Sequence, residues 1–204
     1  EIYDTPDVSI PGGNQEVCEG TSVSFSSDIT GSGTYDYQWQ LDGTDISGET
    51  NPSLSYDAST LPSVGSHTVS LVVTDTSSPL NCSTTASVDL TVNEVPEVSI
   101  VGPGQLCEGS SVNYEADVTG SGTYDYQWQL DGSDISGETN STLSYDASTL
   151  PAVGSHSISV EVVDVSNPTN CSENASIAVE IYDTPDVSIP GGNQEVCEGT
   201  SVSF

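Results

Sequence analysis

The chain contains five cysteines, and their regular spacing makes their chemistry the easiest to predict from the sequence. Cys18 and Cys82 lie 64 residues apart, Cys107 and Cys171 lie 64 residues apart, and Cys197 begins a further pair. Regular cysteines in an acidic chain predict disulfide bonds, which persist in oxidising surroundings. Zinc binding is much less favoured, since no two cysteines lie close in the sequence. We therefore expect structural disulfides and an extracellular location.

The two histidines lack the neighbours that catalysis needs. His67 and His156 follow matching Gly-Ser pairs in two copies of one segment. No cysteine or second histidine stands at a metal-ligand spacing, and no nucleophile is paired with either ring. We interpret both as edge residues of a loop at the start of the same strand, and we expect neither enzymatic activity nor a catalytic cofactor.

The twelve residues SGTYDYQWQLDG occur twice, at 32–43 and at 121–132, and combine aromatic rings with carboxylates. Sugar-binding loops often have this composition, but the three aromatic residues alternate and so point to one side of a strand. We therefore predict that Trp39 and Trp128 are core residues, with an exposed sugar-stacking platform as the less favoured alternative. The Asp-Gly pair that follows predicts a hairpin turn, because Gly accepts positive φ without penalty. Ca²⁺ held by the two Asp of each turn is the less favoured alternative, because the turn supplies too few ligands alone.

Acidic side chains also gather where one repeat passes into the next. Glu94 and Glu97 flank Pro96, and Asp183 and Asp186 flank a second proline. Proline lacks an amide donor and has a fixed φ, so it stiffens the connection. We interpret the four carboxylates as solvated linker residues. Ca²⁺ bound at the junctions is the alternative, which removal of the ion with a chelator would test.

The charge of the chain is extreme and one-sided. It contains 31 Asp and Glu residues and no Lys or Arg, which gives a formal net charge of -31. Nucleic acids and anionic membrane surfaces are recognised through Lys and Arg, so we expect neither as a partner. The sequence has no run of about 18 apolar residues, which predicts no membrane insertion. No signal peptide is visible at the start, and we expect an internal section of a longer polypeptide.

A repeat organises the whole sequence. The motif CEGTSVSF, or the close variant CEGSSVNY, occurs three times at spacings of 89 and 90 residues. Residues 1–25 recur letter for letter at 180–204. Copies this close indicate a tandem array. We predict repeats at 1–94 and 95–183 and the start of a third at 184–204.

Each repeat has the pattern of short strands. In ASVDLTVN, residues 86–93, apolar and polar side chains alternate, which predicts a half-buried strand. Clusters of Gly, Pro, Asn and Ser separate similar runs, and no helical period competes. In the first repeat we expect strands at 7–10, 22–27, 35–41, 44–47, 53–57, 67–75 and 84–93. This profile predicts an all-β chain of tandem immunoglobulin-like sandwiches arranged end to end.

The order of the motifs resembles a known class of repeat. Cys-x-Gly precedes the second strand, Tyr-x-Trp lies in the third, and a final Cys precedes the last. Over all 204 residues, the chain resembles the PKD-like and immunoglobulin-like repeats of giant Bacteroidota surface adhesins. The resemblance implies export by the type IX secretion system, with gliding-motility adhesins of the SprB type as the functional parallel. Because Trp39 leads into Gln40, Leu41, Asp42 and Gly43, unlike the usual PKD motif, no ligand binding is carried over.

Two disulfide pairings remain open for such a sandwich. Pairing within repeats would join Cys18 to Cys82 and Cys107 to Cys171. In an immunoglobulin-like strand order, however, Cys18 and Cys82 lie at opposite poles, roughly 26–33 Å apart, whereas a disulfide spans about 7 Å between Cα atoms. Pairing between repeats would join Cys18 to Cys171, Cys107 to a third repeat, and Cys82 to a preceding one.

These observations predict a mechanical role. We expect a structural segment of a long extracellular, cell-surface adhesin stalk or filament that holds a binding tip away from the cell. Neighbouring repeats of the same chain are the expected partners, and other filament subunits and surface glycans are further candidates. The alternative is a polyvalent carbohydrate- or surface-binding module, in which many weak sites act together.

Overall fold

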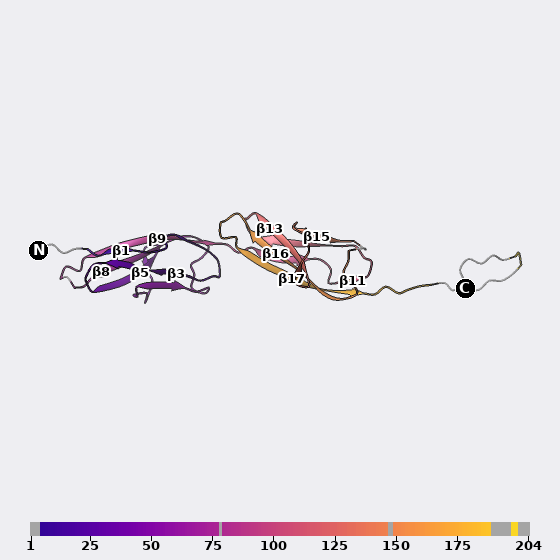
Figure 1. Ribbon diagram of the computed structural model, residues 1–204, viewed down its shortest axis with the longest axis horizontal. Coiled ribbons are helices and arrows are strands. Elements are labelled where there is room, and N and C mark those ends of the chain that lie inside the picture. Colours follow the sequence, from indigo (N-terminus) through magenta and orange to yellow (C-terminus); the bar gives the residue numbers. More distant parts are fainter. Residues whose placement is uncertain (1–4, 78, 147–148, 189–196, 200–204) are drawn as a thin grey trace.

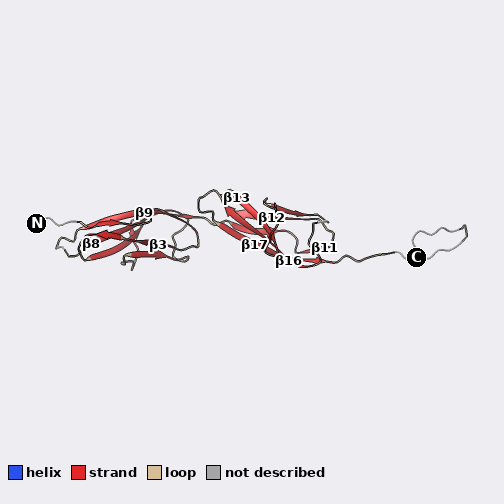
Figure 2. Cartoon of the chain, in the orientation of Figure 1, coloured by secondary structure: helices blue, strands red, loops and turns tan. Residues whose placement is uncertain are grey.

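The computed structural model describes residues 5–77, 79–146, 149–188 and 197–199. In these ranges every regular element is a strand, and the strands build two modules that follow one another along the long axis of the molecule (Figure 1). Figure 2 shows the same arrangement by secondary structure. The described residues include no helix that could cross a membrane. The prediction of an all-β chain is confirmed.

The first module spans 7–93. Its described strands are β1 (Asp7–Ser9), β2 (Gln15–Cys18), β3 (Val23–Ser26), β4 (Asp28–Thr30), β5 (Tyr35–Leu41), β6 (Thr44–Asp45), β7 (Ser53–Tyr56), β8 (Gly65–Asp75) and β9 (Ser83–Asn93). Five of them form a sheet with the order β2-β9-β8-β5-β6, and the pairs β1-β4 and β3-β7 supply the facing layer. The β2-β9 pair is parallel, and the β5-β8 and β8-β9 pairs are antiparallel.

The second module spans 97–182 and repeats this plan. Its described strands are β10 (Glu97–Val101), β11 (Gln105–Cys107), β12 (Val112–Thr119), β13 (Tyr124–Leu130), β14 (Ser133–Asp134), β15 (Thr142–Tyr145), β16 (Gly154–Asp164) and β17 (Ser172–Tyr182). One sheet has the order β11-β17-β16-β13-β14, and the other has the order β10-β12-β15. The continuous β12 takes the place of β3 and β4, which are separate in the first module.

Alternating side chains account for the core between the two layers. In β3, Val23 and Phe25 are buried while Ser24 and Ser26 are exposed, which is the two-residue period of a strand with one face in the core. From the opposite sheet Trp39 enters the same core, with its ring centroid 6.4 Å from that of Phe25. The second module has an equivalent core around its own tryptophan.

The Asp-Gly hairpins are present in both modules. Asp42 and Gly43 have φ values of 50° and 79°, and Asp131 and Gly132 have φ values of 50° and 77°. Positive φ at both positions is typical of the two-residue type I′ turn between antiparallel strands, and Asp and Gly are among the residues that accept it. The turns join β5 to β6 and β13 to β14.

Three strand predictions for the first module need correction. β2 was not expected, because its four residues QEVC lie beside a Pro-Gly-Gly segment and show no clear alternation. The strand expected at 22–27 is the shorter β3, and a separate β4 follows it. The strand expected at 44–47 is limited to Thr44–Asp45. These are short segments, in which a two-residue period has too few positions to be recognised.

Most of the expected third repeat, 184–204, lies outside the described residues. Residues 184–188 continue from β17 as exposed, irregular chain, and in 197–199 the exposed Cys197 is followed by two turn residues.

Candidate functional site

The junction between the modules brings together groups that are far apart in the sequence. Cys18 at the end of β2 is in register with Asn93 at the end of β9, so both lie at the same pole of the first module. Cys171 immediately precedes β17, which starts at this junction and runs through the second module (Figure 1). The connection from β9 to β10 contains Pro96, which is buried.

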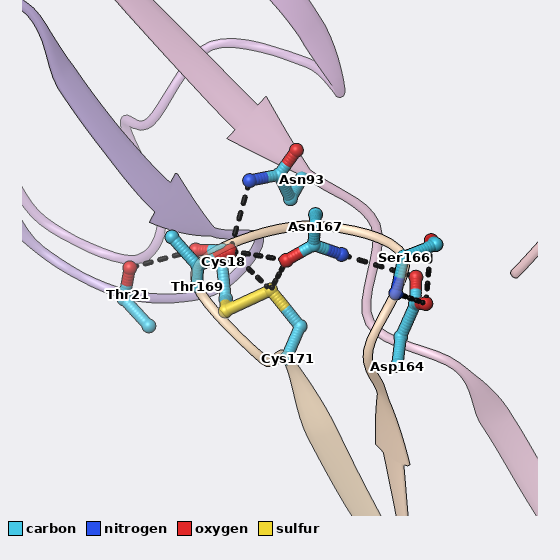
Figure 3. Close-up of a disulfide and its surroundings, with 8 residues drawn as sticks. All are labelled: Cys18, Thr21, Asn93, Asp164, Ser166, Asn167, Thr169 and Cys171. Carbon is cyan, nitrogen blue, oxygen red and sulfur yellow. Dashed lines mark hydrogen bonds between the residues drawn. A yellow bond between two sulfur atoms is a disulfide. The ribbon is translucent and has the colours of Figure 1, made fainter. Parts of the chain in front are cut away.

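A disulfide crosses this junction. It joins Cys18 to Cys171, which are 153 residues apart in the sequence and have Cα atoms 5.6 Å apart (Figure 3). This is the pairing between repeats, one of the two alternatives that the sequence left open. Cys82 precedes β9, and that strand is 11 residues long, so about 36 Å of extended chain separates Cys82 from the pole that carries Cys18. A bond between these two would require the sandwich to open.

Polar side chains beside the disulfide connect the modules a second time (Figure 3). The side-chain amide of Asn93 donates a hydrogen bond of 2.9 Å to Thr169 Oγ1. Thr169 Oγ1 in turn donates to Asn167 Oδ1 at 2.5 Å, and the Asn167 amide donates to Asp164 Oδ2 at 3.0 Å. The chain of hydrogen bonds therefore runs from the last residue of the first module into the loop before Cys171.

Asp164 anchors that loop. Its side chain is 8% exposed, and its Oδ1 accepts hydrogen bonds from the backbone and hydroxyl of Ser166, at 2.9 and 2.6 Å. Burial alone would raise the pKa of the Asp164 carboxyl, but the hydrogen bonds from Ser166 and Asn167 outweigh burial and hold the pKa below its ordinary value. The loop is thus fixed by an ionised carboxylate without any Lys or Arg.

The four acidic residues proposed for a metal site do not form one group. Glu97 lies in β10 and accepts a hydrogen bond from Thr119 Oγ1 at 3.1 Å, while Glu94 is exposed in the connection between modules. Asp183 and Asp186 are exposed beyond β17. Among the described residues, no three His, Cys, Asp or Glu side chains are placed to hold a metal ion together. Calcium at the junctions stays a prediction from sequence alone.

The repeated tryptophans lie in the two cores. Trp39 and Trp128 are both 0% exposed, and each indole Nε1 donates a hydrogen bond of 2.9 Å to a backbone oxygen, of Asn51 and Asn140 respectively. Neither ring has a face turned to solvent on which a sugar could stack.

Each histidine forms an ion pair that the sequence did not reveal. His67 Nδ1 lies 2.8 Å from Asp42 Oδ2, and its Nε2 lies 2.8 Å from the Ser63 carbonyl oxygen. His156 has the same partners in the second module, Asp131 and Ala152. Both histidines lie near the start of a strand, as expected, because β8 begins at Gly65 and β16 begins at Gly154.

Both nitrogens of His67 face acceptors, so only the doubly protonated imidazolium can donate to both. The hydrogen bond to Asp42 is the main cause that raises the pKa of His67 above its ordinary 6.5, and the same bond lowers the pKa of Asp42 below 3.8. A raised histidine pKa contributes stability that is complete below about pH 6.5 and is lost as the pH rises through the folded-state value. The lowered aspartate pKa contributes stability that is lost only when the pH falls below about 3.8.

We therefore expect the ion pairs to stabilise both modules near pH 5 to 6 and to be lost in alkaline solution. The measurement is the melting temperature of the protein and of an Asp42→Asn, Asp131→Asn variant across pH 5 to 9. Asn tolerates the positive φ and can still accept the Thr68 and Ser157 amides, so the variant removes mainly the charge. The difference between the two proteins should shrink by a few degrees as the pH rises. A difference that is constant over this range would contradict the ion-pair interpretation.

Comparison with known proteins shows which of them this chain is similar to. No family model matches the chain. The chain is similar to the "Highly immunogenic outer capsid protein" of Enterobacteria phage T4, with 28% identity over 188 residues, which cover 84% of this chain and 48% of that protein. The chain thus spans about half the length of the curated relative it matches.

Solved structures of immunoglobulin domain arrays share the fold. The N-terminal eight immunoglobulin domains of the Down Syndrome Cell Adhesion Molecule match with a TM-score of 0.58 and 15% identity, over 85% of this chain and 27% of that one. An I-band fragment from titin matches with a TM-score of 0.52 and 15% identity, over 87% and 66%. The chain consists of tandem immunoglobulin-like domains. At these identities the likeness shows the fold alone.

Proposed function

We propose that this chain is a stiff spacer segment of a longer surface-exposed protein, and that its repeats hold a binding tip away from the surface that carries it. The observation that carries the proposal is the disulfide between Cys18 and Cys171, which joins two modules and not two strands of one module. A covalent bond placed beside the connecting peptide gives the junction two attachment points, which restricts bending.

The hydrogen bond from Asn93 to Thr169 supports the same role, because it adds a polar contact across the junction. Each module contributes length, since a strand of 11 residues such as β9 or β17 spans about 36 Å. The charge of -31 keeps neighbouring chains apart and in solution. Nothing in this arrangement requires a catalytic group.

A location outside the cell, on an exposed surface, is part of the proposal. Disulfides persist in oxidising surroundings, and the similar phage protein is described as an outer capsid protein. The resemblance to Bacteroidota adhesins supports a cell-surface stalk exported by type IX secretion, whereas the phage relative supports a projection from a capsid. The ends of the complete gene would distinguish them: an export signal and sorting domain support the stalk, and neighbouring capsid genes support the projection.

The spacer role is tested by small-angle X-ray scattering of the oxidised protein and of a Cys18→Ser, Cys171→Ser variant. We expect a slender particle in both, with a broader distribution of distances between modules in the variant because one attachment is lost. Cys82→Ser is the matched control, since it removes a thiol and leaves the bridge intact. A compact particle, or no change in the distance distribution of the variant, would overturn the proposal.

A polyvalent binding module is the second candidate. An open pocket of about 500 Å³ beside the β13-β14 hairpin is lined in part by Asp134, Glu138 and Tyr145. The carboxylates of Asp134 and Glu138 can accept hydrogen bonds from the hydroxyl groups of ligands such as glycans. A glycan array probed with this protein tests the candidate, and binding that Glu138→Ala abolishes would support it. The absence of binding to every glycan would remove it.

A further inference from the structure

We infer that Asn140 is an acceptor site for an N-linked glycan, and that the matching asparagine of the first module is not. Residues 140–142 read Asn-Ser-Thr, which is the N-x-S/T sequon of N-glycosylation, whose middle residue is not proline. The modifying enzyme would be an oligosaccharyltransferase, and the donor an oligosaccharide attached to a lipid diphosphate. Such a glycan goes beyond the spacer function, because its attachment does not require the Cys18–Cys171 bridge.

A sequon alone is a weak signal in a chain this rich in Ser and Thr. The sequence contains four, which begin at Asn81, Asn140, Asn170 and Asn174. Bacterial oligosaccharyltransferases also require an acidic residue two positions before the asparagine, because they contact its carboxylate through a cationic side chain. Glu138 stands at that position before Asn140, whereas the other three sequons have proline or serine there. Residues 138–142, ETNST, are therefore the best acceptor in the chain.

The fold holds the backbone of this segment against the sandwich and leaves its side chains in solvent. The Asn140 carbonyl oxygen accepts a hydrogen bond of 2.9 Å from Trp128 Nε1. The Ser141 carbonyl oxygen accepts one of 2.8 Å from the Ala116 amide. Asn140, Ser141 and Thr142 are all exposed. The acceptor amide and the threonine hydroxyl thus lie on the surface, where a glycan does not disturb the core.

The same place in the first module has the same fold but a blocked sequon. The Asn51 carbonyl oxygen accepts a hydrogen bond of 2.9 Å from Trp39 Nε1. The Pro52 carbonyl oxygen accepts one of 2.9 Å from the Ser27 amide. Residues 49–53 read ETNPS, so the acidic residue and the asparagine are present, but proline stands in the middle and prevents glycosylation. The two modules therefore differ in acceptor function and not in local fold.

The strands that follow these two segments are edge strands, which gives the difference a physical reason. In the described part of the chain, β7 and β15 each have one neighbouring strand, and their residues SLSY and TLSY carry no charge. An uncharged edge strand invites pairing with other chains, and proline is one of the features that prevent it. Pro52 directly precedes β7. A glycan on Asn140 would cover the start of β15 in place of that proline.

The position of Asn140 also leaves the junction between the modules free. Thr142 pairs with Glu115, near the middle of β12, and β15 lies on the second module away from the first (Figure 1). By contrast, Asn170 directly precedes the bridged Cys171, which is 1% exposed. A glycan on Asn170 would crowd the junction, whereas one on Asn140 projects from the flank.

The transfer breaks one bond and forms one. Nδ2 of Asn140 attacks C1 of the first sugar of the donor, and the bond between C1 and the phosphate oxygen breaks. The lipid diphosphate leaves with the electron pair of that bond. The amide loses one proton, which passes to solvent, and nothing is oxidised or reduced. The new linkage is an uncharged N-glycosyl amide.

The experiment exports the full chain from a bacterium that carries an oligosaccharyltransferase and a lipid-linked oligosaccharide of known mass. The purified protein is weighed by intact mass spectrometry and mapped with a Glu-specific protease, because the chain has no tryptic sites. Cleavage after Glu places the four sequons in different peptides, and the peptide 139–161 carries that of Asn140 alone. The same bacterium without the transferase supplies the unmodified reference mass.

We expect the mass to rise by one oligosaccharide, attached to the peptide 139–161. Asn140→Gln and Thr142→Ala should each abolish this rise, while both keep the carbonyl group that Trp128 contacts. Glu138→Gln should lower the glycosylated fraction by about tenfold, because the transferase loses a charged contact. Pro52→Ser is the matched gain-of-function variant: it restores the sequon at Asn51 and should add a second oligosaccharide. All four variants should melt as the parent protein does.

A parent protein without added mass would overturn the inference, and so would a glycan on another sequon with none on the peptide 139–161. A rise in mass that persists in Thr142→Ala would overturn it as well, since the transfer would not depend on the sequon. The scattering experiment on the Cys18→Ser, Cys171→Ser variant has a separate readout. Failure of glycan transfer therefore leaves the spacer function standing, and a flexible junction leaves the glycan site standing.

Discussion

Replacing Trp39 with Ala is expected to lower the stability of the first module by about 3–5 kcal/mol and to leave the second module folded. The indole is 0% exposed, packs against Phe25, and donates a hydrogen bond to the Asn51 carbonyl. Its removal leaves both a cavity and an unsatisfied carbonyl. For a domain of about ninety residues, whose total stability is roughly 5–13 kcal/mol, such a loss is a large fraction.

Calorimetry resolves this effect, because the two modules can melt as separate transitions. One transition should fall by at least about 12 °C in Trp39→Ala, while the fluorescence of the remaining Trp128 should report an unchanged second module. Trp128→Ala is the mirror control and should reverse the pattern. Val64→Ala, at a residue that is 45% exposed in the first module, should change stability by no more than about 0.5 kcal/mol.

A Trp39→Ala protein with an unaltered melting profile would contradict the core assignment. A loss of both transitions would show instead that the modules unfold as one unit. The second outcome would place much of the stability in the junction and not in the separate cores.

The fold was predictable from the sequence wherever the alternation of side chains is long enough to be read. Residues 35–41, in β5, alternate over seven positions and are followed by an Asp-Gly pair, so both the strand and its turn were predictable. β2 has only four residues and pairs in parallel with β9. No local sequence pattern predicts the pairing of β2 with β9, because this pairing depends on the position of β9 in the folded sheet.

The site was less predictable, because its contacts join residues from different elements or modules. The sequence narrowed the pairing of Cys18 to two partners, and only the assembled junction brings Cys171 within bonding distance. Hydrogen bonding from Asn93 to Thr169 depends on how one module is turned against the next, which no periodicity within a repeat can specify. Asp42, in the turn after β5, and His67, in the neighbouring strand β8, are 25 residues apart in the sequence. The only signal of this ion pair in the sequence was the spacing of 25 residues between the Asp and the His, which is the same in both repeats.

Stretching the protein between its two ends should reveal the disulfide most directly. When force is applied to residues 1 and 204, the covalent path passes from Cys18 directly to Cys171, so residues 19–170 carry no load. The loaded chain is then limited to 1–18 and 171–204, which together are 52 of the 204 residues. At about 3.6 Å per residue, it can extend to about 190 Å. Without the bridge the fully unfolded chain can extend to about 730 Å.

Single-molecule force spectroscopy of the oxidised protein should therefore end at roughly a quarter of the extension that a Cys18→Ser, Cys171→Ser variant reaches. Addition of a reductant during stretching should release the hidden length of the unmodified protein in one step, because cleavage of one bond frees all residues between the two cysteines. Cys82→Ser should behave like the unmodified protein, since its sulfur lies outside the bridge. If the oxidised protein instead extends in two separate module-sized steps without reductant, the modules are not covalently joined at this junction and the load passes through each in turn.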